Sequence, residues 1–249
     1  MEGGRVRGRP GRWRAARQLA PDGRATSRSD DARAIPAAWV APLAFAACYA
    51  YAPAGETSGC RGSRALALRL KRADPLGLAE LSVEVWRQVR GGGRFAAFFR
   101  ADTVLVPVPG SAAEPGARWV GQQLAGCLSE LGLGQSVQSL LRRRHAVRKS
   151  ATSPAGLRPT VMDHYASFAV RCVRTGCGPP SRLVLVDDVI TRGRTLLAGA
   201  ARLREAFPRA EILAFALLRT LAPGEAVRAN PDPREGLVWW ARGDARRSP

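Results

Sequence analysis

Two adjacent carboxylates, Asp187 and Asp188, follow a short apolar run and precede a segment rich in threonine and glycine. The whole segment reads Asp187-Asp188-Val189-Ile190-Thr191-Arg192-Gly193-Arg194-Thr195 and opens a helical pattern. Backbone N–H groups at a helix N-terminus bind phosphate, glycine permits close backbone approach, and threonine hydroxyls donate further hydrogen bonds. Adjacent carboxylates suit the vicinal hydroxyls of a ribose, directly or through Mg²⁺. These residue types at this spacing predict a site for a 5-phosphorylated ribose.

A simpler interpretation exists for each residue of this segment taken alone. Two aspartates before a Thr/Gly-rich stretch can be an N-cap and a turn with no ligand. The combination is more specific: four apolar residues, two acids, two apolar residues, then Thr-x-Gly-x-Thr at the start of a helix. It favours the phosphate site. Arg192 and Arg194 inside the segment could support the phosphate or point to solvent, and the sequence leaves both alternatives open.

The elements that must position this segment follow from the apolar pattern. Residues 182–186 (RLVLV) contain an apolar run that is typical of a buried parallel strand. A helical pattern over 195–207 and a strand pattern over 211–218 complete a right-handed βαβ unit. A strand at 103–108 and a helix at 117–131 extend it. The predicted fold is α/β, with a doubly wound, mainly parallel sheet whose ligands lie at the carboxyl ends of its strands.

Composition divides the chain into three parts. Residues 1–34 are rich in Arg, Gly, Pro and Ser with little apolar periodicity, which predicts a disordered tail. An organellar transit peptide and an over-extended reading frame start are alternatives for this stretch. Residues 35–100 carry helical patterns over 64–72 and 76–90 and form a helical N-terminal region, and residues 101–249 form the core.

Other segments have a weaker pattern. Residues 142–165 are basic and rich in turn-forming residues, which predicts a long loop, and its run Arg142-Arg143-Arg144 is typical of a solvated cationic face. Residues 237–240 predict a final edge strand, with Trp239 and Trp240 covering the sheet edge. His145 in the basic loop is expected to be solvated rather than to act as an acid or base.

The segment 187–195 resembles the motif of type I phosphoribosyltransferases that binds 5-phosphoribosyl-1-pyrophosphate (PRPP). Among these enzymes the chain is most similar to the ComF family, over about residues 60–220. Residues 106–109 (Val-Pro-Val-Pro) are similar to the family's strand entering the pyrophosphate loop, and residues 144–168 resemble the flexible loop that closes over PRPP.

The resemblance extends to isolated residues on the predicted helices. Lys71 is similar to a lysine on an early helix of ComF-like proteins, although an exposed lysine that packs its stem on the surface is the alternative. Arg118 and Gln122 fall near an Arg and a Gln of the family. Only Cys48 and Cys60 stand where ComF proteins commonly carry a four-cysteine zinc module, so zinc is not expected.

What the resemblance implies is a sheet of the type I phosphoribosyltransferase kind with a small helical hood for the acceptor. A nitrogen nucleophile of unknown identity would displace pyrophosphate from C1 of PRPP, with Mg²⁺ bound through the pyrophosphate and through Asp187 and Asp188. Many proteins of this fold are homodimers. The implied site residues are Asp187, Asp188 and Lys71 as catalytic residues, Asp187, Asp188, Val189, Ile190, Thr191, Arg192, Gly193, Arg194 and Thr195 for PRPP, and Pro107, Val108, Pro109, Gly110 and Ser111 for pyrophosphate.

Charge supports a second class of function. The chain has 39 Lys and Arg against 20 Asp and Glu, a net charge of +19, and its only lysines are Lys71 and Lys149. This arginine bias fits codon preference and polyanion binding equally well. A non-catalytic ComF-like module that handles nucleic acid, with single-stranded DNA as partner, is therefore one alternative to the enzyme, and a PRPP-sensing regulator is another.

Cysteine usage and hydropathy predict the compartment. Five cysteines without a CxxC pair favour reduced thiols in a cytoplasmic protein over a metal-thiolate site. No apolar run approaches the about 18 residues of a membrane span, so no membrane partner is expected.

Overall fold

The computed structural model describes residues 39, 41–72, 74–112, 119–148, 157–171 and 178–248. The chain divides into two compact units, Met1–Ala34 and Ile35–Pro249, and all described residues belong to the second. The predicted tail at residues 1–34 lies outside the described residues, and so do Arg118, Lys149, Cys172 and Cys177.

Seven strands of the described chain form one mixed, mostly parallel sheet in the order β3-β2-β6-β7-β1-β8-β9. The first five strands in this order are parallel to their neighbours, β8 is antiparallel to β1, and β9 is antiparallel to β8. The strands are β1 (Leu43–Tyr51), β2 (Thr103–Pro107), β3 (Ser136–Val137), β6 (Arg182–Ile190), β7 (Glu211–Thr220), β8 (Arg234–Ala241) and β9 (Asp244–Arg247). A separate antiparallel pair joins β4 (Leu141–Arg143) to β5 (Phe168–Val170).

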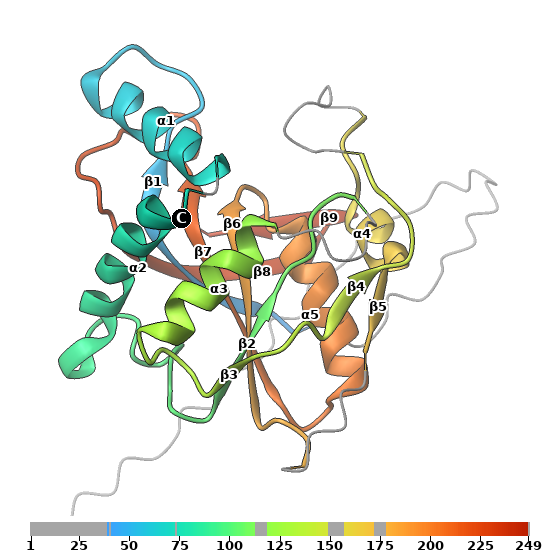
Figure 1. Ribbon diagram of the computed structural model, residues 1–249. Helices are drawn as coiled ribbons and strands as arrows, with labels where there is room; N and C mark the ends of the chain where they lie inside the picture. The colour runs from blue at the N-terminus through green and yellow to red at the C-terminus, as the bar shows by residue number, and fades with distance from the viewer. Residues whose placement is uncertain are drawn as a thin grey trace, which may run out of the picture. The chain divides into compact units, whose positions relative to one another are not determined.

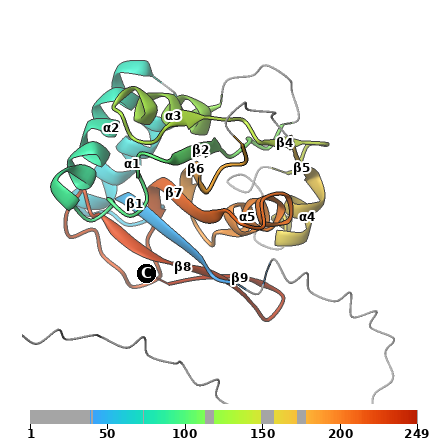
Figure 2. The ribbon, with the colours of Figure 1, turned by 90° about the horizontal axis from the view of Figure 1, so that it is seen from below.

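Five α-helices of the described chain flank this sheet on its two faces (Figure 1, Figure 2). One face packs against α1 (Ser58–Lys71), α2 (Pro75–Val89) and α3 (Val120–Glu130), and the other against α4 (Val161–Ser167) and α5 (Arg194–Ala206). The α/β class and the mostly parallel sheet that the sequence predicts are confirmed. No helix in the described ranges is long and apolar enough to span a membrane.

Strand β6 shows how the two faces divide the core. Leu183 and Leu185 pack with α5 on one face, while Val184 and Val186 pack with α2 and α3 on the other. All four side chains are fully buried. Because successive side chains of a strand point to opposite faces, a strand covered on both sides must be apolar throughout, which explains its continuous apolar run.

Strand β1 has no counterpart among the elements that the sequence predicts. It lies inside the sheet between β7 and β8 and is almost entirely buried. Its sequence, LAFAACYAY, contains no β-branched residue and is rich in alanine, so its aromatic residues are its only intrinsic strand signal. Pairing with two neighbouring strands, rather than local preference, fixes its conformation.

The predicted edge strand at 237–240 is also different in the structure. Strand β8 is longer and lies inside the sheet, because β9 pairs with it and forms the edge. Trp240 packs inward, with its ring centroid 5.0 Å from that of the buried Trp39. The hairpin β8–β9 also carries Asp244 to the start of α5, where its carboxylate accepts hydrogen bonds from Arg194.

The order of the strands creates a switch point between β2 and β6. From β2 the chain moves outward to β3, whereas from β6 it moves in the opposite direction to β7. Connections that diverge in this way leave a crevice at the carboxyl ends of the two strands, and ligands of open α/β sheets bind there. Those carboxyl ends are followed by the two loops that the sequence predicts to bind pyrophosphate and phosphoribose.

We expect replacement of Leu185 by alanine to lower the free energy of unfolding by about 2–5 kcal/mol, because it removes buried methyl groups and leaves a cavity. The matched control is Leu237→Ala on β8, where the side chain is 46% exposed and the expected change is within about 0.5 kcal/mol. Chemical denaturation measures both. Equal losses from the two variants would contradict the placement of Leu185 between the two layers.

Candidate functional site

The two predicted ligand loops start side by side. Pro107, the last residue of β2, pairs with Val186 of β6, and the backbone N–H of Val108 donates to the Val186 carbonyl at 2.9 Å. The segment 108–111 therefore begins next to Asp187. The structure brings together two stretches that are far apart in the sequence, at the edge to which the arrowhead of β6 points in Figure 1.

Strand β6 is longer than the sequence pattern indicates. It continues through Ile190, so Asp187 and Asp188 lie on the strand rather than after it, and the turn consists of Thr191, Arg192 and Gly193. The predicted end at Val186 is wrong because parallel pairing with β7 extends through the carboxylates. The two carboxylates consequently have fixed backbone positions instead of loop positions.

Gly193 allows the turn into α5. Its φ of 80° is left-handed, and a Cβ at this position would lie 2.7 Å from Val238 of β8. Any other residue would meet both conformational strain and a steric clash. Helix α5 then begins at Arg194, and its first N–H groups lack intrahelical partners, which makes this turn suitable for an anion.

The two arginines of the loop are both directed to one carboxylate of β9. The guanidinium of Arg194 donates to both carboxylate oxygens of Asp244, at 2.7 and 2.6 Å, and to the carbonyl of Pro159 at 3.0 Å. Arg192 is more exposed and lies 3.2 Å from the same carboxylate. Arg194 thus neither points to solvent nor contacts the loop interior, an arrangement that differs from both alternatives left open by the sequence.

Arg143 is buried, in contrast to the solvated cationic face predicted for Arg142-Arg143-Arg144. It lies in strand β4, where alternation directs Arg142 outward and Arg143 inward. Its Nε donates to the Gly110 carbonyl at 2.9 Å, one terminal nitrogen contacts the hydroxyl of Ser167, and the guanidinium lies 4.1 Å from the centroid of the Phe168 ring. The predicted pyrophosphate loop is therefore held by a buried cation.

The same guanidinium fixes the state of His164. Its second terminal nitrogen lies 3.2 Å from Nδ1 of His164, and arginine can only donate, so Nδ1 accepts and the proton is on Nε2. Nε2 lies 3.4 Å from the hydroxyl oxygen of Thr195. Burial of the ring, and next the charge of Arg143, lower the pKa of His164 to about 4. His164 is neutral at physiological pH.

Arg143 and His164 thus join the two loops through one buried cluster, which we call the Arg143 cluster: Arg143, His164 and Ser167. It contacts Gly110 of the first loop and Thr195 of the second. A further link is the backbone N–H of Val147, which donates to the Ser111 carbonyl at 2.9 Å. The sequence signal for this cluster is weak. It consists of the capping box of Thr160 and Asp163, which marks the start of the helix that carries His164.

The carboxylates of the site are held in an unfavourable environment. The backbone N–H of Asp188 donates to the Asp187 carboxylate at 2.9 Å, and that of Val189 donates to the Asp188 carboxylate at 2.9 Å. Burial, and next the neighbouring charge of Asp188, raise the pKa of Asp187 well above its ordinary value, while the charge of Arg143 offsets part of this. Asp187 therefore favours a partner that supplies protons or positive charge.

The remaining predicted residues lie farther from this centre. Lys71 is exposed in the last turn of α1, and no hydrogen bond or ion pair found among the described residues joins it to either loop. Gln122 is partly buried in the first turn of α3, and His145 is exposed as expected. Near Gln122, Trp119 Nε1 and Gln123 Oε1 are buried and find no hydrogen-bond partner among the residues that the structure describes.

The described residues do not offer a complete metal site made of side chains alone. The described chain contains no group of three or more His, Cys, Asp or Glu side chains arranged around a common ion position. Asp187 and Asp188 supply hard oxygen donors, which fit Mg²⁺ when a ligand provides the remaining oxygens. The described cysteines, Cys48, Cys60 and Cys127, are free thiols.

Neither a protein-family model nor a curated protein matches this chain. The site combines three features: a turn at the start of α5 that suits an anion, two carboxylates beside it, and a second loop across the switch point.

We expect Asp187→Asn to stabilise the ligand-free protein at neutral pH. The folded-state pKa of Asp187 lies above its unfolded value of about 3.9, so the contribution of neutral Asp187 is complete below about pH 4 and declines as the pH rises through the folded-state pKa. Asparagine keeps the acceptor for the Asp188 N–H and does not ionise. The melting temperature of the variant should exceed that of the wild type at pH 7 and should match it below pH 4.

The control is Asp102→Asn, which removes one exposed carboxylate and corrects for the change in net charge. A gain for Asp187→Asn that is equally large below pH 4, or that Asp102→Asn reproduces, would show that ionisation of Asp187 is not its cause.

Proposed function

We propose that this protein is a PRPP-binding phosphoribosyltransferase with a type I, ComF-like core, which transfers the phosphoribosyl group to a nitrogen nucleophile and releases pyrophosphate. The observation that carries the proposal is the meeting of two loops at the switch point. A loop suited to phosphoribose and a loop suited to pyrophosphate lie across adjacent strand ends and share the Arg143 cluster. PRPP is a ligand that contains both groups.

The phosphoribose half of the ligand matches the loop after β6. Asp187 and Asp188 would accept hydrogen bonds from the ribose hydroxyls, and the turn from Thr191 to Thr195 would hold the 5-phosphate at the start of α5. Because His164 Nε2 carries a proton directed at the Thr195 oxygen, the hydroxyl proton of Thr195 is left to donate to the phosphate.

The pyrophosphate half matches residues Pro107 to Ser111. Arg143 donates a hydrogen bond to the Gly110 carbonyl, and the backbone N–H of Val147 donates one to the Ser111 carbonyl. This orients the backbone of the loop before a ligand arrives, and preorganised donors cost little reorganisation during reaction. Mg²⁺ bound with PRPP would supply positive charge for the departing pyrophosphate.

In the reaction the bond from C1 to the pyrophosphate oxygen breaks with its electron pair, and a bond from C1 to the acceptor nitrogen forms. The protein's part is mainly to position and to stabilise charge. The acceptor would lie under the hood, where α1 stands beyond the carboxyl end of β1 in Figure 1. There, Gly59 of α1 faces Val227 of the loop after β7, so the segment after β7 contributes to the same region.

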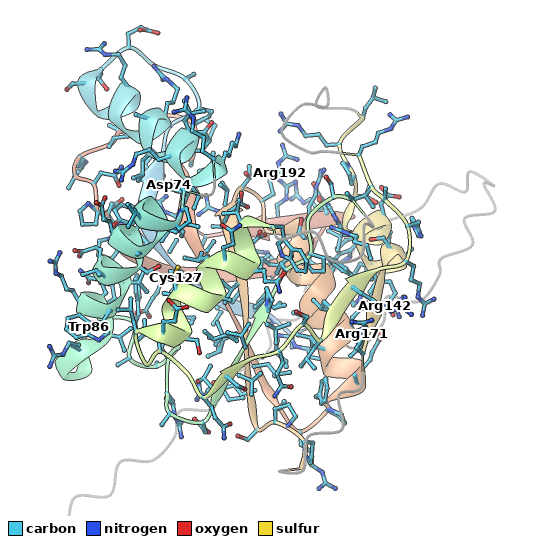
Figure 3. The ribbon with its side chains drawn as sticks, in the orientation of Figure 1. Asp74, Trp86, Cys127, Arg142, Arg171 and Arg192 are labelled. Carbon is cyan, nitrogen blue, oxygen red and sulfur yellow. The ribbon has the colours of Figure 1, made fainter. Side chains whose placement is uncertain are left out.

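A second candidate function is nucleic-acid handling, and one surface favours it. Arg142, Arg144 and Arg171 are exposed on or next to the β4–β5 pair, and Figure 3 shows Arg142 and Arg171 close together. The affinity of this surface for a polyanion would fall steeply as the salt concentration rises, because each phosphate contact releases counterions. Single-stranded DNA binding that survives Asp187→Asn/Asp188→Asn would favour this function over transfer.

We expect PRPP with Mg²⁺ to raise the melting temperature of the wild type. A ligand at about 100 times its dissociation constant adds roughly 2.7 kcal/mol to the free energy of unfolding when it binds only the folded state. Asp187→Asn/Asp188→Asn should abolish the shift, while Asp102→Asn should keep it. If the wild type does not respond, the proposal is wrong; if it responds but no acceptor releases pyrophosphate, the protein is a PRPP sensor.

We expect the His164–Thr195 contact to appear as a coupling in PRPP affinity. Thr195→Val should weaken binding by about 2 kcal/mol, since it removes a hydrogen bond to a charged group. His164→Asn keeps an acceptor for Arg143 but removes the Nε2 proton, and should cost about 1 kcal/mol. Calorimetric dissociation constants should show that the double variant is no weaker than Thr195→Val. Additive losses would mean that His164 acts on the fold and not through Thr195.

A further inference from the structure

A cavity separate from the Asp187–Asp188 centre opens beside the turn from Thr191 to Gly193, on the side that faces β9. Its volume is about 300 Å³, at the lower end of the range for small-molecule sites of about 300–1,000 Å³. It lies between the carboxyl ends of β6 and β7 and strand β9. Thr191 and Arg192 are the only residues of the predicted PRPP loop that line it, among the described residues.

The polar lining of this cavity is cationic. Three arginines, Arg192, Arg246 and Arg247, contribute to it, and no acidic residue of the described chain does. Thr191 and Thr220 add two hydroxyls whose oxygens are 3.1 Å apart. In such a pair one hydroxyl donates to the other, so the accepting hydroxyl keeps a proton that can be donated to a ligand.

The side chain of Arg247 is held in this lining by hydrogen bonds to backbone carbonyls. Its Nε donates to the Thr191 carbonyl at 2.8 Å and one terminal nitrogen donates to the Thr220 carbonyl at 2.7 Å. The other terminal nitrogen lies 3.3 Å from the Ser248 carbonyl. These bonds hold the guanidinium across the ends of β6 and β7. A guanidinium carries five N–H donors, so further donors of Arg247 have no partner among the described residues.

Arg247 forms no ion pair with a carboxylate among the described residues, and Glu225 acts on it only through its charge. In the part of the chain that the structure describes, no Asp or Glu lies within ion-pair distance of Arg246 or Arg247. The nearby Glu225 is engaged by the buried Arg219 through two hydrogen bonds of 2.8 and 2.7 Å. Burial, and next the charge of Arg219, lower the pKa of Arg247 to about 10. The charge of Glu225 offsets part of this cost without forming an ion pair with Arg247, and a bound anion would relieve more of it.

We propose that this cavity is an anion-binding site for a small organic phosphate, with Arg247, Arg246 and Arg192 as its cations and the Thr191–Thr220 pair as its hydroxyl donors. Arg192 shares its charge with Asp244, so Arg246 and Arg247 supply the two cations without an ion pair among the described residues, and two positive charges match a phosphate dianion better than a single carboxylate. The remaining walls, which include Leu221 and Pro223, are apolar and suit a compact apolar body attached to the phosphate. The site does not depend on PRPP binding, although Thr191 connects it to the phosphate turn.

The test separates this cavity from the turn at α5. Asp187→Asn/Asp188→Asn/Thr195→Val serves as the background, so that the proposed PRPP centre contributes little. Calorimetry at constant ionic strength measures the dissociation constants of inorganic phosphate, phenyl phosphate and benzoate. We expect phenyl phosphate to bind more tightly than inorganic phosphate, and benzoate to bind most weakly.

Arginine variants in the same background assign the binding. Arg246→Ser should weaken phenyl phosphate about fivefold, and Arg247→Gln about tenfold or more. The matched control is Arg209→Ser, which removes another exposed cation after α5, at the amino end of β7. If Arg247→Gln does not fold, because that side chain ties two strand ends together, Arg246→Ser together with Arg192→Ser carries the test.

Three results would overturn the proposal. Phosphate binding that disappears in the background variant would place the anion in the turn at α5. An equal loss from Arg209→Ser would reduce the effect to diffuse charge. Benzoate that binds as tightly as phenyl phosphate would show that the cavity does not select a phosphate.

Discussion

The guanidinium of Arg143 is a buried cation, and the arrangement of the site follows from the need to supply its partners. Burying a charge is costly unless its donors are satisfied, and Arg143 finds an aromatic face, a hydroxyl, an imidazole nitrogen and the Gly110 carbonyl. These partners come from several segments of the chain. Satisfying one side chain therefore positions β4, α4 and the loop after β2 together, and through His164 it also reaches the first residues of α5.

A second constraint is the crowding of like charges at the switch point. Asp187 and Asp188 are adjacent acids on a covered strand, while Arg143 can offset only part of their cost. The fold thus holds negative charge where a polyhydroxyl ligand and a cation would be stabilised. Sites that keep such unfavourable groups lose stability in exchange for binding, and this explains why the carboxylates lie on a rigid strand and not on a free loop.

The C-terminal hairpin β8–β9 encloses the turn from Thr191 to Gly193 on its other side. Val238 packs against Gly193. The Asp244 carboxylate accepts hydrogen bonds from the Arg194 guanidinium, and Arg247 donates a hydrogen bond to the Thr191 carbonyl. The turn is consequently enclosed by residues from the very end of the described chain. Its two arginines are turned toward Asp244, so the donors of the turn that remain for an anion at the start of α5 are backbone N–H groups and threonine hydroxyls.

The amino-acid sequence by itself determined the α/β class, the buried strand before the carboxylates, the helix after them, and the strand that contains Val-Pro-Val-Pro and leads into a second loop. These features are local in the sequence: a continuous apolar run, a glycine that a left-handed turn requires, and a threonine-rich helix start. Only the tertiary structure decided that alanine-rich β1 is a central strand, that Arg143 is buried while Arg142 is not, and that Asp244 captures Arg194. Those outcomes depend on which distant segment supplies a hydrogen bond, a counter-charge or a neighbouring strand, and such partners leave no periodic trace in the sequence around the residue itself.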